Sequence, residues 1–264
     1  MVAEADSTTC IVAGGGPAGI MLGLLLARGG IDVTVMEKHA DFLRDFRGDT
    51  GHTSTLRLLD ELGLAADFAR MPHREIQSLN MLIQGTPVEI DLRRIPGPHK
   101  HIALVPQWEF LELLAAAADK EPTFRLLRST EVLSPIRRGD KVIGVSYRDS
   151  DGQVGELYAE LTVACDGRSS TLRDTMGLKP RNFGAPMDVL ARVQVRRWLP
   201  AVLVQSVQRV IHNRVIAVAV SAGQPVKPPL LVRIANKVPA LRAAAGYAVA
   251  VGPLPEHVPA FARR

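Results

Sequence analysis

Two stretches decide the fold of this chain: Thr9-Cys10-Ile11-Val12-Ala13-Gly14-Gly15-Gly16-Pro17-Ala18-Gly19 and Val33-Thr34-Val35-Met36-Glu37. An apolar, β-branched run leads directly into a Gly-x-Gly-x-x-Gly pattern formed by Gly14, Gly16 and Gly19. A helical pattern of apolar residues follows, and a second short apolar strand then ends in an acid. This order of strand, glycine loop, helix, strand and acid predicts a βαβ unit of the dinucleotide-binding type.

Each residue of the glycine loop has a predicted physical task. We expect Gly14 to make the tight turn out of the strand and Gly16 to let the backbone approach a pyrophosphate. Gly19 would allow the helix to pack closely on the sheet. Pro17 and Ala18 begin the helix, whose first N–H groups and dipole favour an anion.

An acid ends the second strand at the position expected for a ribose ligand. Glu37 follows Gly16 at roughly the 20-residue distance typical of the residue that accepts hydrogen bonds from an adenosine ribose. Lys38 comes directly after it and is included in the predicted cofactor site.

Composition is that of a globular protein. The 264 residues are 47% hydrophobic and 22% charged, enough for one large domain or two interleaved ones. Two cysteines, Cys10 and Cys165, exclude a disulfide scaffold, and we interpret them as core residues of a protein in a reducing compartment. The apolar run 11–27 contains Pro17 and several glycines and has no basic residue before it, so it is not read as a signal peptide. The predicted location is cytoplasmic.

Charge is distributed unevenly along the sequence. Residues 191–264 contain eleven Lys or Arg and a single acid, Glu256, within a chain whose net charge is +5. This step predicts a boundary near residue 190. Because few aromatic residues are interleaved with the tail's basic ones, nucleic-acid binding is not expected, and a solvated basic face is favoured over contact with an anionic membrane.

Elsewhere in the chain, the spacing of apolar residues predicts further helices and strands. Helical spacing marks 53–69 and 108–118, and alternating apolar residues around a turn at 84–87 predict antiparallel strands over 76–92. A β-meander is expected over 131–136, 141–147 and 155–159, followed by a short buried strand over 161–165. In the tail, residues 199–211 have helical spacing, whereas the prolines beyond Gly223 are expected to break the chain into short pieces.

Three further sequence features accompany the glycine loop and Glu37. Arg47 lies in the polar loop 41–51, Gln107 follows Pro106 at the start of a helix, and Cys165-Asp166-Gly167-Arg168 follows a strand. With the glycine loop and Glu37, they make residues 9–190 resemble the class A flavoprotein monooxygenases of the p-hydroxybenzoate hydroxylase type.

The resemblance implies an α/β fold with a discontinuous Rossmann-like FAD-binding domain, formed by residues 1–75 and 101–185. Residues 76–100 and 186–190 would be the remnant of a truncated antiparallel substrate-domain sheet, and 191–264 a basic helical C-terminal region.

The same resemblance implies the cofactor and its ligands. Gly14 to Gly19 would hold the FAD pyrophosphate and Glu37 the adenosine ribose. Arg47 and Gln107 match positions at the flavin phosphate and ribityl chain, for which their donors and acceptors are suited. Asp166 lies in a motif associated with both FAD and NAD(P)H. The implied reaction is hydroxylation or epoxidation of a small aromatic or apolar substrate with NAD(P)H and O₂.

The pattern departs from the family in one respect. The family's later Gly-Asp motif, which contacts the ribityl chain and flavin ring, has no counterpart here. We infer an internal deletion with its seam near Leu190–Arg192. Two hypotheses follow: an active FAD-dependent oxidoreductase, completed where necessary as a homodimer, or a non-catalytic nucleotide-binding remnant. No catalytic residue is assigned, and His99 and His101 lack the neighbours typical of a metal site.

Overall fold

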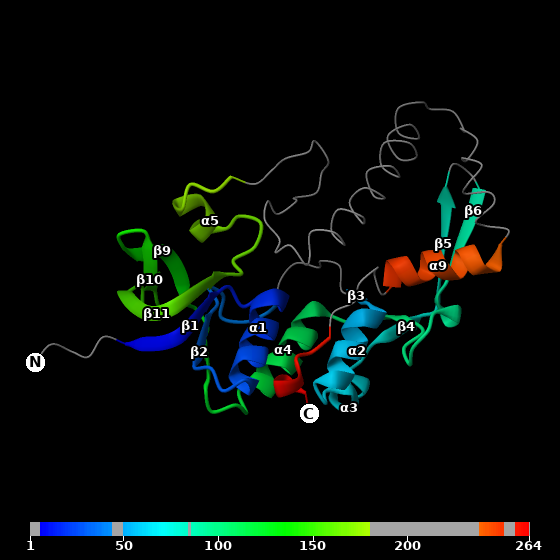
Figure 1. The fold of residues 1–264 in the computed structure, drawn as a ribbon, viewed down its shortest axis with the longest axis horizontal. Coiled ribbons are helices and arrows are strands. Elements are labelled where there is room, and N and C mark those ends of the chain that lie inside the picture. Colours follow the sequence, from blue (N-terminus) through cyan, green and yellow to red (C-terminus); the bar gives the residue numbers. More distant parts are fainter. Residues whose placement is uncertain (1–5, 44–49, 84–85, 180–237, 251–256, 264) are drawn as a thin grey trace, which may run out of the picture.

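The computed structural model describes residues 6–43, 50–83, 86–179, 238–250 and 257–263. The predicted α/β class is confirmed (Figure 1). In chain order the elements are β1 (Ser7–Ala13), α1 (Pro17–Arg28), β2 (Val33–Met36), β3 (Thr50–Gly51), α2 (Thr53–Glu61), α3 (Ala65–Ala69), β4 (Arg74–Ile76), β5 (Ser78–Ile83), β6 (Thr86–Asp91), the 3₁₀ helix η1 (Leu92–Arg94), β7 (Ile102–Leu104), α4 (Gln107–Ala118), β8 (Phe124–Leu127), β9 (Glu131–Arg138), β10 (Lys141–Arg148), β11 (Val154–Ala164), α5 (Thr171–Thr175), α9 (Pro239–Ala250) and η3 (Ala260–Ala262).

A six-stranded sheet forms the centre of the described structure, in the order β8-β2-β1-β11-β10-β9. The first four strands run parallel, with Val12 of β1 opposite Val35 of β2 on one side and Val163 of β11 on the other. Strands β10 and β9 then continue the sheet in antiparallel pairing. The carboxyl ends of β1, β2 and β11 therefore lie together at one edge, where ligands bind in open α/β sheets.

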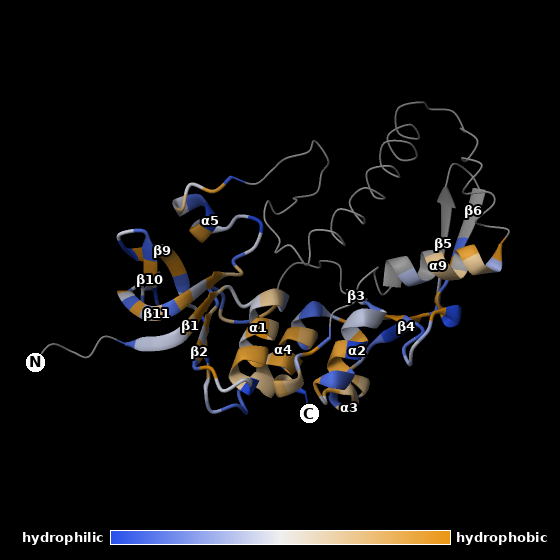
Figure 2. Ribbon diagram, viewed as in Figure 1, coloured by the Kyte–Doolittle hydropathy of each residue, from blue (hydrophilic) through white to orange (hydrophobic). Residues whose placement is uncertain are grey.

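Strand β1 is buried on both faces, as its continuous apolar sequence predicts. Cys10 and Val12 face a large core shared with α1 and α4, whereas Ile11 and Ala13 face a second core below α5. Figure 2 shows the apolar surfaces of α1 and α4 side by side next to the sheet. The glycine loop is thus anchored between two packed layers.

The remaining strands form smaller units. Strand β7 lies between β3 and β4 in an antiparallel sheet, and β5 pairs with β6 in a separate hairpin. Helix α9 lies beside this hairpin in Figure 1 and contacts β6 and η1, with Tyr247 against the buried Leu92, Ile95 and Ile102. The expected antiparallel strands in 76–92 are present.

Two expectations about the elements are wrong. The pattern over 53–69 is two helices rather than one, because Gly63 adopts φ +69° between them. The two strands expected over 155–159 and 161–165 are the single strand β11, and its Leu161 is 55% exposed rather than buried. Within the C-terminal region, which is expected to be helical, residues 239–250 do form a helix of three turns, begun by Pro239, which is tolerated at a first helical position. The helix expected over 199–211 and the seam at 190–192 lie outside the described residues.

Residues 257–263 pack against α1 and α2. Val258 and Ala262 join the core next to α1, and Glu61 of α2 accepts hydrogen bonds from the Val258 amide and the His257 imidazole, both at 2.6 Å. Burial opposes ionisation of Glu61, but these hydrogen bonds outweigh it and hold its pKa below the ordinary range. The buried Arg28 side chain donates to the Ala262 carbonyl at 3.2 Å.

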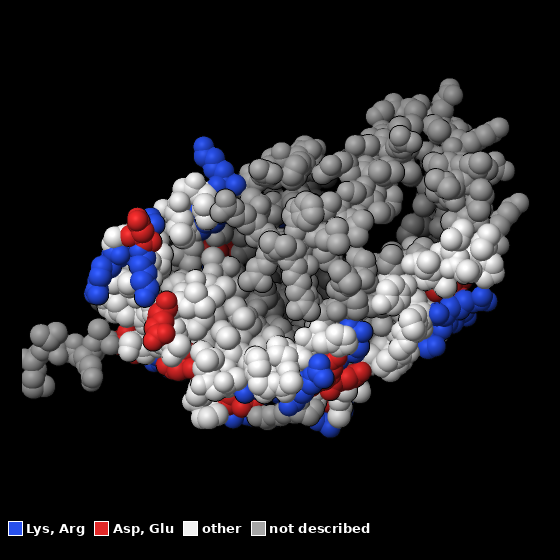
Figure 3. All heavy atoms as spheres, in the orientation of Figure 1, with Lys and Arg blue, Asp and Glu red and all other residues white. Residues whose placement is uncertain are grey.

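On the face shown in Figure 3, basic and acidic side chains are mixed, and the described residues form no continuous patch of one charge. Among the described residues, no helix reaches the length and apolar character needed to cross a bilayer.

Candidate functional site

The glycine loop leaves β1 in the conformation that its sequence predicts. Gly14 has φ +106°, and a Cβ there would lie 2.4 Å from the Cys165 carbonyl oxygen, so only glycine fits. A Cβ on Gly19 would lie 1.8 Å from the Gly14 carbonyl oxygen, which shows how closely α1 packs on the loop. At Gly16, by contrast, a Cβ would meet no atom of the described residues within 4 Å. Among the four glycines of the loop, only the one expected to face a ligand has open space at the Cβ position in the described structure.

Helix α1 begins at this open position. Gly16 is its N-cap residue, with φ −72° and ψ −177°, and no side chain caps the helix. Pro17 and Ala18 in the first turn are exposed. Backbone N–H groups at a helix start with no side-chain cap favour an anion, with an electrostatic contribution of about 0.3–1 kcal/mol from the helix dipole.

Glu37 directly follows β2 beside the glycine loop, and its carboxylate is held by the chain itself. It is 3% exposed. One oxygen, Oε2, accepts from the Gly15 N–H at 2.8 Å, and the other, Oε1, accepts from the His39 N–H at 3.0 Å and contacts His39 Nδ1 at 2.6 Å. Lys38, between them, is exposed. The sequence analysis did not identify His39, although a polar residue two positions after the acid could have indicated a hydrogen-bond partner for Glu37.

Asp166 stands at the same edge of the sheet, directly after β11. The turn that carries it touches the glycine loop, because a Cβ on Gly14 would lie 2.9 Å from the Asp166 nitrogen. Its Oδ2 accepts from the Leu172 N–H at 3.1 Å in the first turn of α5. Gly167, with φ +84°, lets the chain turn between strand and helix. One role of Asp166 is therefore to fix α5 next to the loop.

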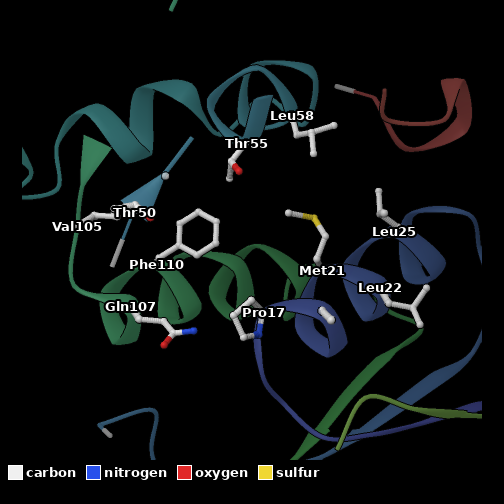
Figure 4. Close-up of a pocket in the computed structure, with 12 residues that line it drawn as sticks. Pro17, Met21, Leu22, Leu25, Thr50, Thr55, Leu58, Val105, Gln107 and Phe110 are labelled. Atoms are coloured by element: carbon white, nitrogen blue, oxygen red, sulfur yellow. The ribbon is translucent and has the colours of Figure 1, made fainter. Parts of the chain in front are cut away.

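A cavity of about 540 Å³ adjoins the start of α1 and extends along that helix (Figure 4). Gln107 and Phe110 of α4 line one side, and Phe110 and Met21 point into it. Its walls are mainly apolar and come from α1, α2, α4 and the β3 strand: Pro17, Ala18, Met21, Leu22, Leu25, Thr50, Gly51, Thr55, Leu58, Val105, Gln107 and Phe110. Trp108, next to Gln107, is 39% exposed.

The predicted site residues fall into three groups. The glycine loop, Glu37 and Asp166 meet at the carboxyl edge of β1, β2 and β11. Gln107 lines the cavity beside Pro17 at the start of α1. Arg47 lies outside the described residues.

The two cysteines do not form a disulfide. Burial raises the pKa of both the Cys10 and the Cys165 thiol, with a further contribution to Cys165 from Asp166. Both thiols are therefore protonated at neutral pH, which disfavours nucleophilic chemistry.

The histidines of the 99–101 loop lie in a second, smaller cavity of about 210 Å³ below α2 and α3. His99 Nε2 contacts Asp60 at 2.6 Å, and His101 Nε2 lies 3.6 Å from Glu75. Burial lowers the pKa of His101 despite the nearby Glu75 carboxylate. Within the described ranges, no group of three or more His, Cys, Asp or Glu side chains has an arrangement that could hold a metal ion.

Comparison with protein families gives one clear match. A family model described as an FAD binding domain matches residues 7–233. Among curated proteins, 6-methylpretetramide 4-monooxygenase of Streptomyces rimosus is 34% identical over 178 residues, which cover 67% of this chain and 42% of that protein.

Solved structures agree on the fold. Anhydrotetracycline hydroxylase from Streptomyces rimosus superposes with a TM-score of 0.58 and 28% identity, covering 67% of this chain and 35% of that one. p-Nitrophenol 4-monooxygenase from Pseudomonas putida superposes with a TM-score of 0.60 at 22% identity, covering 67% and 45%. The chain thus spans less than half the length of these relatives.

Proposed function

Because the chain belongs to the family of FAD-binding domains, we propose that it binds FAD at the glycine loop and acts as the cofactor-binding part of a flavin-dependent monooxygenase. The open space above Gly16 carries this proposal. It lies at the start of α1, where no side chain occupies the N-cap, and at the edge where three parallel strands end. A pyrophosphate requires this combination of close backbone approach and N–H donors.

Each part of the site has a proposed role toward the cofactor. The loop from Gly14 to Gly19, with Pro17 and Ala18, would bind the pyrophosphate. Glu37 and Lys38 would lie at the adenosine ribose of the cofactor. Gln107 would supply a donor and an acceptor to the ribityl hydroxyls, and Arg47 a planar cation to a phosphate. Asp166, which accepts the Leu172 N–H and so fixes the start of α5, would lie close to both FAD and NAD(P)H.

When bound, FAD supplies the redox chemistry: it takes a hydride from NAD(P)H and activates O₂ for hydroxylation or epoxidation. The contribution of this chain is to bind and orient the cofactor. The apolar side chains around Met21 and Phe110 keep one side of the proposed site poor in polar groups, which strengthens electrostatic contacts there.

The relatives suggest the class of substrate. The names of two of them specify 6-methylpretetramide and anhydrotetracycline. By analogy, we propose a small organic substrate of aromatic or apolar character. A cytoplasmic location and a homodimer, in which a second copy completes the substrate walls, are part of the same proposal; molar mass from light scattering tests the dimer.

The test is the visible absorption spectrum of the purified chain after incubation with excess FAD and desalting. Retention of the bands of bound oxidised flavin supports the cofactor site, and NAD(P)H oxidation that depends on added FAD supports the reaction. Bound flavin without any NAD(P)H oxidation would favour a non-catalytic FAD-binding remnant. A folded but colourless protein would contradict the proposal.

A further inference from the structure

An imidazole covers the acid at the end of β2. The Glu37 side chain is 4% exposed, whereas that of His39, which contacts it at 2.6 Å, is 45% exposed. The two residues therefore form a unit in which the carboxylate is internal and the imidazole faces solvent. A ligand approaching the end of β2 meets much more of His39 than of Glu37.

The hydrogen bonds of this unit determine which atom of His39 carries a proton. An ionised carboxylate only accepts hydrogen bonds, so the short contact with Glu37 Oε1 requires the proton on His39 Nδ1. In the neutral imidazole, Nε2 then has a lone pair that accepts a hydrogen bond. Glu37 thereby fixes the tautomer of the exposed ring.

The carboxylate itself has limited capacity for a ligand. Its Oε2 accepts from the Gly15 N–H at 2.8 Å, and its Oε1 receives the His39 backbone N–H at 3.0 Å in addition to the ring contact. Glu37 therefore ties the glycine loop to the end of β2. These three contacts use most of the roughly four acceptor positions of a carboxylate. Because the Glu37 side chain is only 4% exposed and that of His39 is 45% exposed, a ribose hydroxyl reaches the imidazole more readily than the carboxylate.

We infer that His39 is a recognition residue for the adenosine ribose: its Nε2 accepts a hydrogen bond from a ribose hydroxyl, and Glu37 acts through it as a positioning residue. This inference rests on the proposed function, since it needs the adenosine half of FAD at the edge of the sheet. It transfers part of the ribose contact that the sequence assigns to Glu37 onto its neighbour.

The experiment compares three competitors for the FAD site: ADP, 2′-deoxy-ADP and 3′-deoxy-ADP. Their dissociation constants are measured by displacement of FAD from the full chain, for wild type, His39→Phe and His39→Gln. Phenylalanine keeps the ring and removes both nitrogens, whereas glutamine retains a donor and an acceptor. The control is His99→Phe, because His99 makes an imidazole–carboxylate contact of the same 2.6 Å length with Asp60 in the other cavity.

We expect wild type and the His99→Phe control to prefer ADP over at least one deoxy analogue by about fivefold or more, which is the effect of one hydrogen bond. In His39→Phe that preference should fall below about twofold, because the hydroxyl has lost its partner, and His39→Gln should restore most of it. Thermal melting of each variant confirms that it is folded.

The alternative outcomes are distinguishable. If His39→Phe weakens ADP and both deoxy analogues equally and keeps the preference, His39 only shapes the loop and the inference is wrong. The same conclusion follows if wild type binds FAD without preferring ADP over either analogue. If wild type binds neither FAD nor ADP, the proposed function fails, and this inference with it.

Discussion

Replacement of Gly16 by alanine separates cofactor binding from folding. The backbone of Gly16 has φ −72° and ψ −177°, which is allowed for any L-residue. Apart from its chain neighbours, the added Cβ would meet no atom of the described residues within 4 Å. The variant therefore removes nothing from the folded chain, and its methyl group occupies only the space proposed for the pyrophosphate.

The expected effects have opposite signs for stability and for binding. An alanine in an allowed conformation reduces the entropy of the unfolded chain, so the free energy of unfolding without FAD should be unchanged or rise by about 0.4–1 kcal/mol. Displacing the phosphate should disturb one charge-assisted hydrogen bond, worth about 1.5–3 kcal/mol, and weaken FAD about ten- to a hundredfold. Thermal melting without FAD and titration by flavin absorbance measure the two quantities.

The other two glycines of the motif provide the contrast. Gly19→Ala would place a Cβ 1.8 Å from the Gly14 carbonyl oxygen, so it should destabilise the apo-protein by about 1–3 kcal/mol, as overpacking does. Gly14→Ala adds the strain of φ +106° and should also melt lower. Wild-type FAD affinity in a folded Gly16→Ala variant would refute the assignment of the loop as the pyrophosphate site.

Three further predictions follow from buried or partly buried contacts of α1, α2 and α5. Arg28→Met leaves Glu121 without its 3.3 Å contact between side chains that are 4% and 8% exposed, so the free energy of unfolding should fall by about 3–5 kcal/mol in urea titrations. The exposed pair of Arg125 with Asp6 is the control, and Arg125→Met should cost about 1 kcal/mol or less. The pKa of Glu61 is lowered in the folded state, so its contribution to stability is complete above the unfolded pKa and is lost as the pH falls through the folded value. The protection factor of the Val258 amide, which is its exchange rate relative to that of an unfolded chain at the same pH, should therefore fall on acidification below about pH 4, and Glu61→Gln should abolish that fall. Asp166→Ala removes the acceptor of the Leu172 N–H and should lower the melting temperature by a few degrees, as loss of about 1 kcal/mol predicts, with weaker FAD binding in the same titration.

The sequence predicted the part of the fold in which local signals and tertiary structure agree. Strand β1, helix α1 and strand β2 follow from apolar runs on either side of a glycine loop. The turns at Gly139 and Gly152 were also found, and both adopt positive φ. Strand β8 was missed, because its four residues 124–127 include Arg125 and become a strand only by pairing with β2.

The break between α2 and α3 shows a different limit. Gly63 stood in the middle of a helical pattern, where an isolated glycine is tolerated at a cost of about 1 kcal/mol relative to alanine. The leucines around it kept the helical spacing, so periodicity outweighed the single glycine in the prediction. The positive φ of Gly63 ends α2 and redirects the chain into α3.

For the candidate site, the sequence predicted which residues lie near the glycine loop but not which hydrogen bonds they form. Glu37 was assigned to a ligand because its spacing from the glycine loop fits a ribose contact. Its bonds to Gly15 and His39 depend on side-chain rotamers and on the distance between β1 and β2, and neither can be read from spacing. The approach of Gly14 to Cys165 likewise needs the parallel pairing of β1 with β11, strands separated by most of the described chain.

The position of Trp108 at the start of α4 gives this protein its own optical probe. The side chain is 39% exposed and directly follows Gln107, which lines the cavity beside α1. The chain contains two tryptophans, so Trp198→Phe leaves Trp108 as the only indole emitter. Because oxidised flavin absorbs where indole emits, cofactor capture and release could be followed by fluorescence quenching in real time, with no dye attached.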